Sequence, residues 1–208
     1  MKKLSIYIDE ALRLGKGKRY RYTVKNKPEL QRLVDKLYNK DTHSCDLSMI
    51  DTSQLTEATY IFYNHKDTIK EIDVTGWDVS NFRHFYKIFE GCSSLERIIG
   101  LDTWNVDASK LDWANLGFEH MFRFCSSLKT IDLSTWKMIG KNIDMKGMFD
   151  SCFVLETVKG IDDWQISISR GNTEKLKNLF NNCSNLRCDI SKWPNIPISA
   201  RNLTKIKK

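Results

Sequence analysis

Long apolar runs are missing from this 208-residue sequence. No run approaches the roughly 18 residues that a membrane-spanning helix needs, so we expect no membrane contact. The start of the chain is a poor secretory leader, because Asp9 and Glu10 stand where the apolar core of a signal peptide would be uninterrupted. We therefore expect a cytoplasmic protein whose cysteines stay reduced.

Motifs for metals, phosphates and nucleophiles are missing as well. The sequence has no Cys-x-x-Cys and no His-x-x-x-His pair, two common spacings of metal ligands. Its four histidines, His43, His65, His84 and His120, are far apart, and none belongs to a known nucleophile motif. Residues 15–18, Gly-Lys-Gly-Lys, are too short for a phosphate loop. We predict that the protein is not an enzyme and holds no cofactor and no metal.

What the sequence does contain is a repeat. Five units open on a phenylalanine and close on a tryptophan, and the tryptophans stand 27 to 32 residues apart. A degenerate half unit, Cys45–Ser53, precedes them, with Ile50 in the tryptophan position. Periods of about 20–50 residues mark proteins in which each repeat buries its apolar side on its neighbours. The closing residues are Trp77, Trp104, Trp136, Trp164 and Trp193.

The apolar spacing changes within each unit. Ile131 and Leu133 alternate with polar residues, which is the period of a short half-buried strand. The residues before each strand follow the spacing of a helix face, with serine or asparagine as candidate N-caps. We therefore predict an α/β fold, a leucine-rich-repeat-like right-handed solenoid of short strand-helix coils with an N-terminal α+β cap. The helical spacing is carried by Leu55, Ala58 and Phe62 and by Phe82, Phe85, Ile88 and Phe89, and the N-caps by Ser53, Ser80 and Asn81.

The phrase from Met121 to Trp136, MFRFCSSLKTIDLSTW, carries a family resemblance. It resembles the repeat of the BspA-like leucine-rich repeat proteins, the mycoplasma-type DUF285 repeat found in gut bacteria and their phages. The resemblance spans Asp46 to Trp193, and it implies protein recognition or adhesion more often than catalysis. For a phage-encoded member it implies a place in the virion. This chain departs from the pattern at His65, at the 107–120 excursion and after Trp136.

Charge divides the chain into three segments. Residues 1–45, the expected cap, have a net charge of +7; residues 46–193, the repeats, −4; and residues 194–208, a closing segment and tail, +4. Basic residues alternate with tyrosines in the cap, which is typical of strands that contact phosphates and stack on bases. A charged edge strand in the cap explains the same pattern. The nucleic-acid-binding candidates are Lys16, Lys18, Arg19, Tyr20, Arg21 and Tyr22.

Cys92, Cys125, Cys152 and Cys183 occupy the same position in consecutive units. Stacked units would place them one strand spacing apart, about 4.8 Å. That spacing permits disulfides, but cysteine is also among the most buried residue types. We predict buried free thiols, with a disulfide and a metal site as the alternatives. His65 takes the cysteine position in the first unit, where we expect a partly exposed substitution.

Aspartates stand four residues before the closing position in four units. They are Asp46, Asp73, Asp132 and Asp189, and Asp102 and Asp162 stand two residues before it in the two units with an extra glycine. Such a row captures cations or a basic partner, or else accepts hydrogen bonds from its own turns. We predict a recognition scaffold that meets a protein partner through the strand side chains Glu71, Asp73, Thr75, Thr130, Asp132 and Ser134. The alternative is a nucleic-acid-associated or virion-packaged protein that acts through the basic cap.

Overall fold

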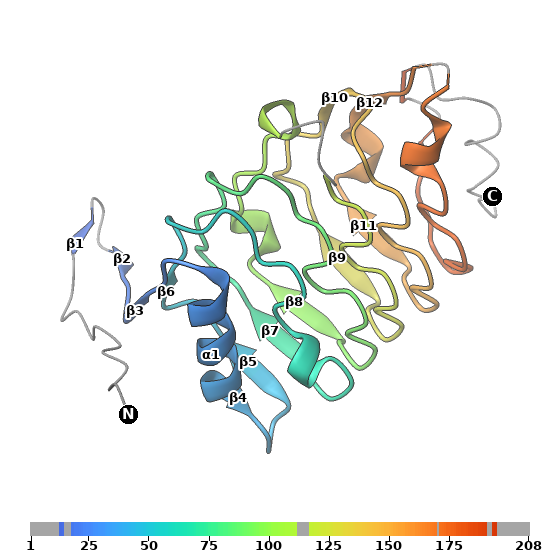
Figure 1. The fold of residues 1–208 in the computed structure, drawn as a ribbon. Coiled ribbons are helices and arrows are strands. Elements are labelled where there is room, and N and C mark those ends of the chain that lie inside the picture. Colours follow the sequence, from blue (N-terminus) through green and yellow to red (C-terminus); the bar gives the residue numbers. More distant parts are fainter. Residues whose placement is uncertain (1–12, 15–17, 112–116, 170, 191–192, 195–208) are drawn as a thin grey trace.

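The computed structural model describes residues 13–14, 18–111, 117–169, 171–190 and 193–194. The prediction of an α/β solenoid built of strand-helix coils is wrong. The described chain is mainly β, with small sheets of two or four strands and one α-helix, and the predicted helical half of each unit is absent (Figure 1). The 194–208 segment lies outside the described residues except for Pro194, as does part of the 107–120 excursion.

Short parallel strands join consecutive units. The largest sheet has the order β4-β5-β7-β8, in which β4 is antiparallel to β5 and the other pairs are parallel. Parallel pairs also join β9 to β11, β10 to β12 and β3 to β6, and β1 pairs with β2 antiparallel. The strands are β1 Arg13–Leu14, β2 Lys18–Arg19, β3 Tyr22–Thr23, β4 Tyr38–Asn39, β5 Ser44–Asp46, β6 Ile50–Asp51, β7 Glu71–Asp73, β8 Arg97–Ile99, β9 Thr130–Asp132, β10 Ile139–Lys141, β11 Thr157–Lys159 and β12 Gln165–Ser167. The helices are α1 Lys27–Leu37 and five 3-10 turns, η1 Tyr63–His65, η2 Leu101–Thr103, η3 Ala108–Lys110, η4 Ile161–Asp163 and η5 Thr173–Leu176.

The segments predicted as helices are runs of tight turns. In the second unit Lys87 and Gly91 have φ of 56° and 79°, so a left-handed residue recurs every fourth position, and a right-handed helix does not continue through such residues. Alternate N–H groups donate to the next unit instead, as from Phe85 to the Gly117 carbonyl at 2.7 Å. Turns of about four residues also bring every third or fourth side chain inward, which explains the misleading period. The same left-handed positions recur at 120 and 124, at 147 and 151, and at 178 and 182.

A column of phenylalanines forms the centre of the core. Each ring stacks on the ring of the next unit, with centroids 5.3 to 5.6 Å apart and planes within 11° of parallel. The members are at most 4% exposed. Stacked rings add about 0.5–1.5 kcal/mol per pair to the burial of their area, so this column ties all five units together. Its members are Phe62, Phe89, Phe122, Phe149 and Phe180.

The closing tryptophans form a second column with one interruption. Ring stacking joins Trp77 to Trp104 to Trp136, and joins Trp164 to Trp193, at 5.8 to 6.2 Å. No ring contact between Trp136 and Trp164 is present among those of the described residues, so the stacking of the closing tryptophans is interrupted at that step. The step coincides with residues 137–143, where the sequence departs from the family pattern and β10 forms.

The hydrogen bonds of the tryptophans are interrupted at the same step. The indole N–H of Trp136 donates to the Leu101 carbonyl of the preceding unit at 2.9 Å, and three other closing tryptophans make the equivalent bond. Trp164 is 3% exposed, and its N–H has no partner among the described residues. We expect Trp136→Phe to cost about 1 kcal/mol more than Trp164→Phe, because only the former gives up a hydrogen bond. Urea unfolding of both variants measures the difference; equal losses would contradict it.

Glycine is required where β8 and β11 end. Gly100 and Gly160 have φ of 89° and 87° and lead into η2 and η4. A Cβ on Gly100 would lie 2.4 Å from the backbone of Thr75, and one on Gly160 would lie 2.6 Å from that of Ser134. The extra glycine of these two units therefore forms a left-handed turn that lies against the preceding unit.

The N-terminal cap covers one end of the stacked units. Asn26 caps α1 by accepting a hydrogen bond from the Glu29 N–H at 3.1 Å, and Leu30, Leu33 and Val34 form its buried face. The helix contacts the first unit through Asp35, whose carboxylate lies 3.0 Å from Nε2 of His65. His65 also stacks on Tyr38, with centroids 4.1 Å apart. In the cysteine position of its unit, His65 thus joins the cap to the repeats.

Candidate functional site

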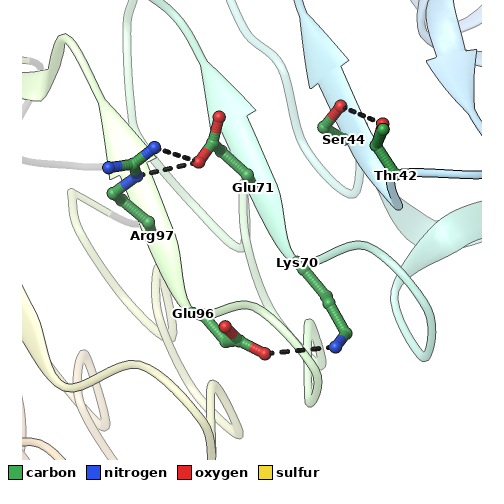
Figure 2. Close-up of a pocket in the computed structure, with 6 residues that line it drawn as sticks. All are labelled: Thr42, Ser44, Lys70, Glu71, Glu96 and Arg97. Carbon is green, nitrogen blue, oxygen red and sulfur yellow. Dashed lines mark hydrogen bonds and ion pairs between the residues drawn. The ribbon is translucent and has the colours of Figure 1, made fainter.

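The exposed side chains of β5, β7, β8, β9 and β11, with the residues directly before these strands, form what we call the outer strand face. On its N-terminal half a shallow depression of about 650 Å³ lies over β5, β7 and β8 (Figure 2). Its lining is polar and comes from three consecutive layers. The lining residues are Thr42, Ser44, Lys70, Glu71, Glu96 and Arg97.

Two ion pairs run between neighbouring layers of this depression. Nε of Arg97 donates to a Glu71 oxygen at 2.8 Å, and Nζ of Lys70 lies 3.4 Å from Glu96 (Figure 2). All four side chains are 37% to 65% exposed. Exposed pairs of this kind contribute about 0–1 kcal/mol each, so a partner can replace them with its own charges at little cost.

The C-terminal half of the outer strand face repeats this arrangement. Lys129 lies 3.3 Å from Glu156, and Nζ of Lys159 donates to Asp132 at 2.9 Å. Hydrogen bonds from the Ser134 hydroxyl and from Lys159 lower the pKa of the Asp132 carboxyl below its ordinary value. Positive and negative charges alternate along the face and neutralise each other in pairs.

The aspartates before the closing position accept hydrogen bonds from their own turns. Asp46 accepts from the Ser48 N–H at 3.0 Å, Asp73 from the Thr75 N–H at 2.8 Å and Asp132 from the Ser134 N–H at 3.2 Å. Among the described residues no group of three or more potential ligands is placed to hold a metal ion. These three aspartates therefore hold their own turns, which is one of the two roles predicted for the row, whereas Asp162 accepts from the Asp189 N–H of the next unit at 2.8 Å.

The predicted partner-binding residues fall into two groups. Glu71, Asp73 and Thr75 belong to the layer of β7, and Glu71 lines the depression. Thr130, Asp132 and Ser134 belong to the layer of β9, in a different sheet. Sequence reasoning missed Lys70, Glu96 and Arg97. The signal that could have found them is the alternation of sign just before each strand, Lys70, Glu96, Lys129 and Glu156.

The basic tract of the cap does not present its aromatic rings together. Tyr22 is 7% exposed and belongs to the core, with Arg21 and Lys36 over its ring. Burial and the nearby Asp51 and Asp78 raise the pKa of the Tyr20 hydroxyl. Arg21 is exposed, Lys16 lies outside the described residues, and Lys18 and Arg19 form β2. A buried ring and two nearby carboxylates are poorly suited to a nucleic acid.

The cysteine column consists of free thiols. Each of three sulfurs donates to the carbonyl of the opening phenylalanine one unit earlier: Cys125 to Phe89 at 3.2 Å, Cys152 to Phe122 at 3.1 Å and Cys183 to Phe149 at 2.9 Å. Burial raises the pKa of the Cys92 and Cys125 thiols and, outside the column, that of Cys45 to about 12. The buried thiols fill the turns and stay protonated, which makes them poor nucleophiles.

Labelling with iodoacetamide at mildly alkaline pH tests this arrangement. We expect Cys183 to react first because it alone is incompletely buried, and the other five cysteines to react only after unfolding, since the thiolate is the reactive form. Peptide mass spectrometry of samples taken over time gives the order. Rapid labelling of Cys125 in the native protein would contradict it.

The comparisons with known proteins give one result. A family model described as "Mycoplasma protein of unknown function, DUF285" matches residues 29–154 and 116–202. No curated protein and no solved structure matches the chain. In the part of the chain that the structure describes, no helix is long and apolar enough to cross a membrane.

Proposed function

The chain belongs to the DUF285 family, and from that premise we propose that it is a non-enzymatic scaffold that recognises a protein partner through its outer strand face. The observation that carries the proposal is the row of exposed, alternating ion pairs along that face, Lys70–Glu96, Glu71–Arg97, Lys129–Glu156 and Asp132–Lys159. The resemblance to BspA-like repeat proteins of gut bacteria and their phages supports the same class of function.

Charge separates a protein partner from a nucleic acid. A polyanion binds where positive charge accumulates and counterions are released. On the outer strand face each of these basic side chains is instead paired with an acidic one. The face therefore complements a surface that carries both signs of charge. Opening an exposed pair costs little, and the partner's charges replace it. Complementary charge patterns of this kind select partners and fix their register more than they add affinity.

Aspartates are poor positions for a test, because Asp73 and Asp132 hold their own turns. Glu71 and Arg97 are better positions for the test. The double exchange Glu71→Arg with Arg97→Glu keeps an ion pair between β7 and β8 but reverses the pattern that a partner meets. We expect the exchange to weaken capture of the natural partner, measured by quantitative affinity purification from the producing cells, and to leave the melting temperature unchanged.

A matched exchange away from the face is the control. Lys177→Glu with Glu174→Lys reverses an exposed ion pair in the turn of η5, at 3.3 Å. This control is expected to capture the partner like the unmodified protein. If the Glu71–Arg97 exchange captured it equally well, the outer strand face would not be the recognition surface.

A further inference from the structure

Three apolar side chains are exposed on the turns that precede β9 and β11. Phe124 is 41% exposed, Phe153 50% and Val154 39%. We call them the apolar turn patch. They lie in consecutive units, since the Phe124 N–H donates to the Asp150 carbonyl at 2.9 Å and Cys152 bonds back to Phe122. These turns form one edge of the molecule, alongside the outer strand face (Figure 1).

Phe153 and Val154 replace the two serines that the second and third units carry at this turn. In the third unit Ser126 and Ser127 donate to the Ser93 carbonyl at 3.1 and 2.7 Å. In the second unit Ser94 donates to the Asp67 carbonyl at 2.7 Å. Phenylalanine and valine have no hydroxyl to donate, so the fourth unit gives up these bonds between layers and exposes apolar area in their place.

Phe124 occupies an unfavourable backbone position. Its φ is 62°, and the equivalent left-handed residues in the other units are Gly91, Ser151 and Asn182. A bulky aromatic residue is rare there, because its side chain crowds the backbone in the left-handed region. The Arg123 guanidinium lies 4.3 Å from the ring and holds it at the surface. Locally costly choices that also expose apolar surface are typical of binding sites.

We propose that the apolar turn patch is the anchor of the interface: it receives a bulky apolar side chain from a segment of another protein, flanked in that segment by an acidic and a basic residue. The inference rests on the proposed function. The flanking charges are set by Lys129 and Glu156, an exposed pair of opposite sign at 3.3 Å that follows the patch along the chain. Buried apolar contacts of this kind carry most of the energy of an interface, and charges at its rim add register.

A second copy of the chain is a poorer occupant. A stable interface buries about 800 Å² on each partner, and three partly exposed side chains supply only a fraction of that area. A single apolar side chain and the residues beside it bury far less area than a dimer interface. The rest of the contact with the partner then lies on the outer strand face.

A displayed library of random dodecapeptides provides the probe. Peptides selected on the intact protein are expected to carry an aromatic or large aliphatic residue between opposite charges. Their affinity, measured with synthetic peptides by fluorescence anisotropy, should fall at least about tenfold on Phe153→Ser with Val154→Ser. That double variant installs the serines of the second and third units, whose hydroxyls bond to the preceding layer, so it is expected to keep the fold. Tyr63→Ser, which removes an exposed aromatic ring from the first unit, is expected to leave affinity unchanged.

The outcomes separate this inference from the proposed function. Failure to enrich any peptide, or equal binding to the serine variant, would overturn the patch as an anchor. Peptides that lose affinity on the Glu71–Arg97 exchange but not on the serine variant would leave the proposed function standing and remove the inference. Peptides affected only by the serine variant would keep the patch as a binding site and show that the region around Glu71 and Arg97 takes no part in recognition, which would remove the proposed function in its present form. Analytical ultracentrifugation that revealed a dimer abolished by the serine variant would assign the patch to self-association and overturn the proposal.

Discussion

Replacing Phe122 by alanine is expected to lower the free energy of unfolding by about 3–5 kcal/mol. The ring is fully buried at the centre of the phenylalanine column, stacked on Phe89 at 5.3 Å and on Phe149 at 5.5 Å. The substitution removes both stacking contacts and leaves a cavity that neighbouring backbone ladders prevent from collapsing. Urea unfolding followed by tryptophan fluorescence measures the loss.

Phe124→Ala is the matched control, two residues further along the same turn. Its ring is 41% exposed, so we expect a change within about 1 kcal/mol. Similar losses for Phe122→Ala and Phe124→Ala would mean that the column is not the centre of the core.

Asp150→Ala is expected to cost about 2 kcal/mol, because it removes a buried carboxylate that accepts charge-assisted hydrogen bonds from neighbouring units. Asp150 is 4% exposed and accepts from Nε of Arg123 at 3.1 Å and from the Asn181 amide at 2.9 Å. It thereby links three consecutive units. Arg123 also lies 3.5 Å from Glu90, which in turn lies 3.1 Å from Lys87, so the network continues into the second unit.

Glu156→Ala removes a carboxylate from an exposed pair and is expected to cost less than about 1 kcal/mol. Thermal unfolding of both variants at one protein concentration compares them. Should Asp150→Ala prove as mild as Glu156→Ala, water would be satisfying the network and the burial argument would be wrong.

The strands and the core were predictable because the repeat shows the same apolar spacing independently in several units. Ile131 and Leu133 alternate with polar residues and are buried as expected, and the family was identified from the phrase around Phe122. The predicted helices were wrong for a specific reason. A spacing of three and four residues arises from consecutive turns as well as from a helix, and side-chain patterns carry no information about the sign of φ. Residues such as Lys87 and His120 adopt left-handed conformations without the glycine that would have revealed them.

The candidate site was only partly predictable. Glu71 was found because it stands on a predicted strand, but its partner Arg97 is 26 residues away and depends on the register between units. The aspartate row looked like a site because it recurs, but three of its members accept hydrogen bonds from their own turns. The apolar turn patch was missed since it breaks the repeat at Phe153 and Val154, and only the exposure of these side chains distinguishes them from core residues.

Site-specific photo-crosslinking tests the central claim that the outer strand face recognises a protein. A benzophenone amino acid is placed at position 71 or 130 on that face, or at position 21 in the basic cap, and the producing cells are irradiated. The account predicts a discrete protein adduct from positions 71 and 130, identified by mass spectrometry, and no nucleic-acid adduct from position 21. Nuclease-sensitive adducts from position 21, with none from positions 71 and 130, would contradict it and assign recognition to the basic cap.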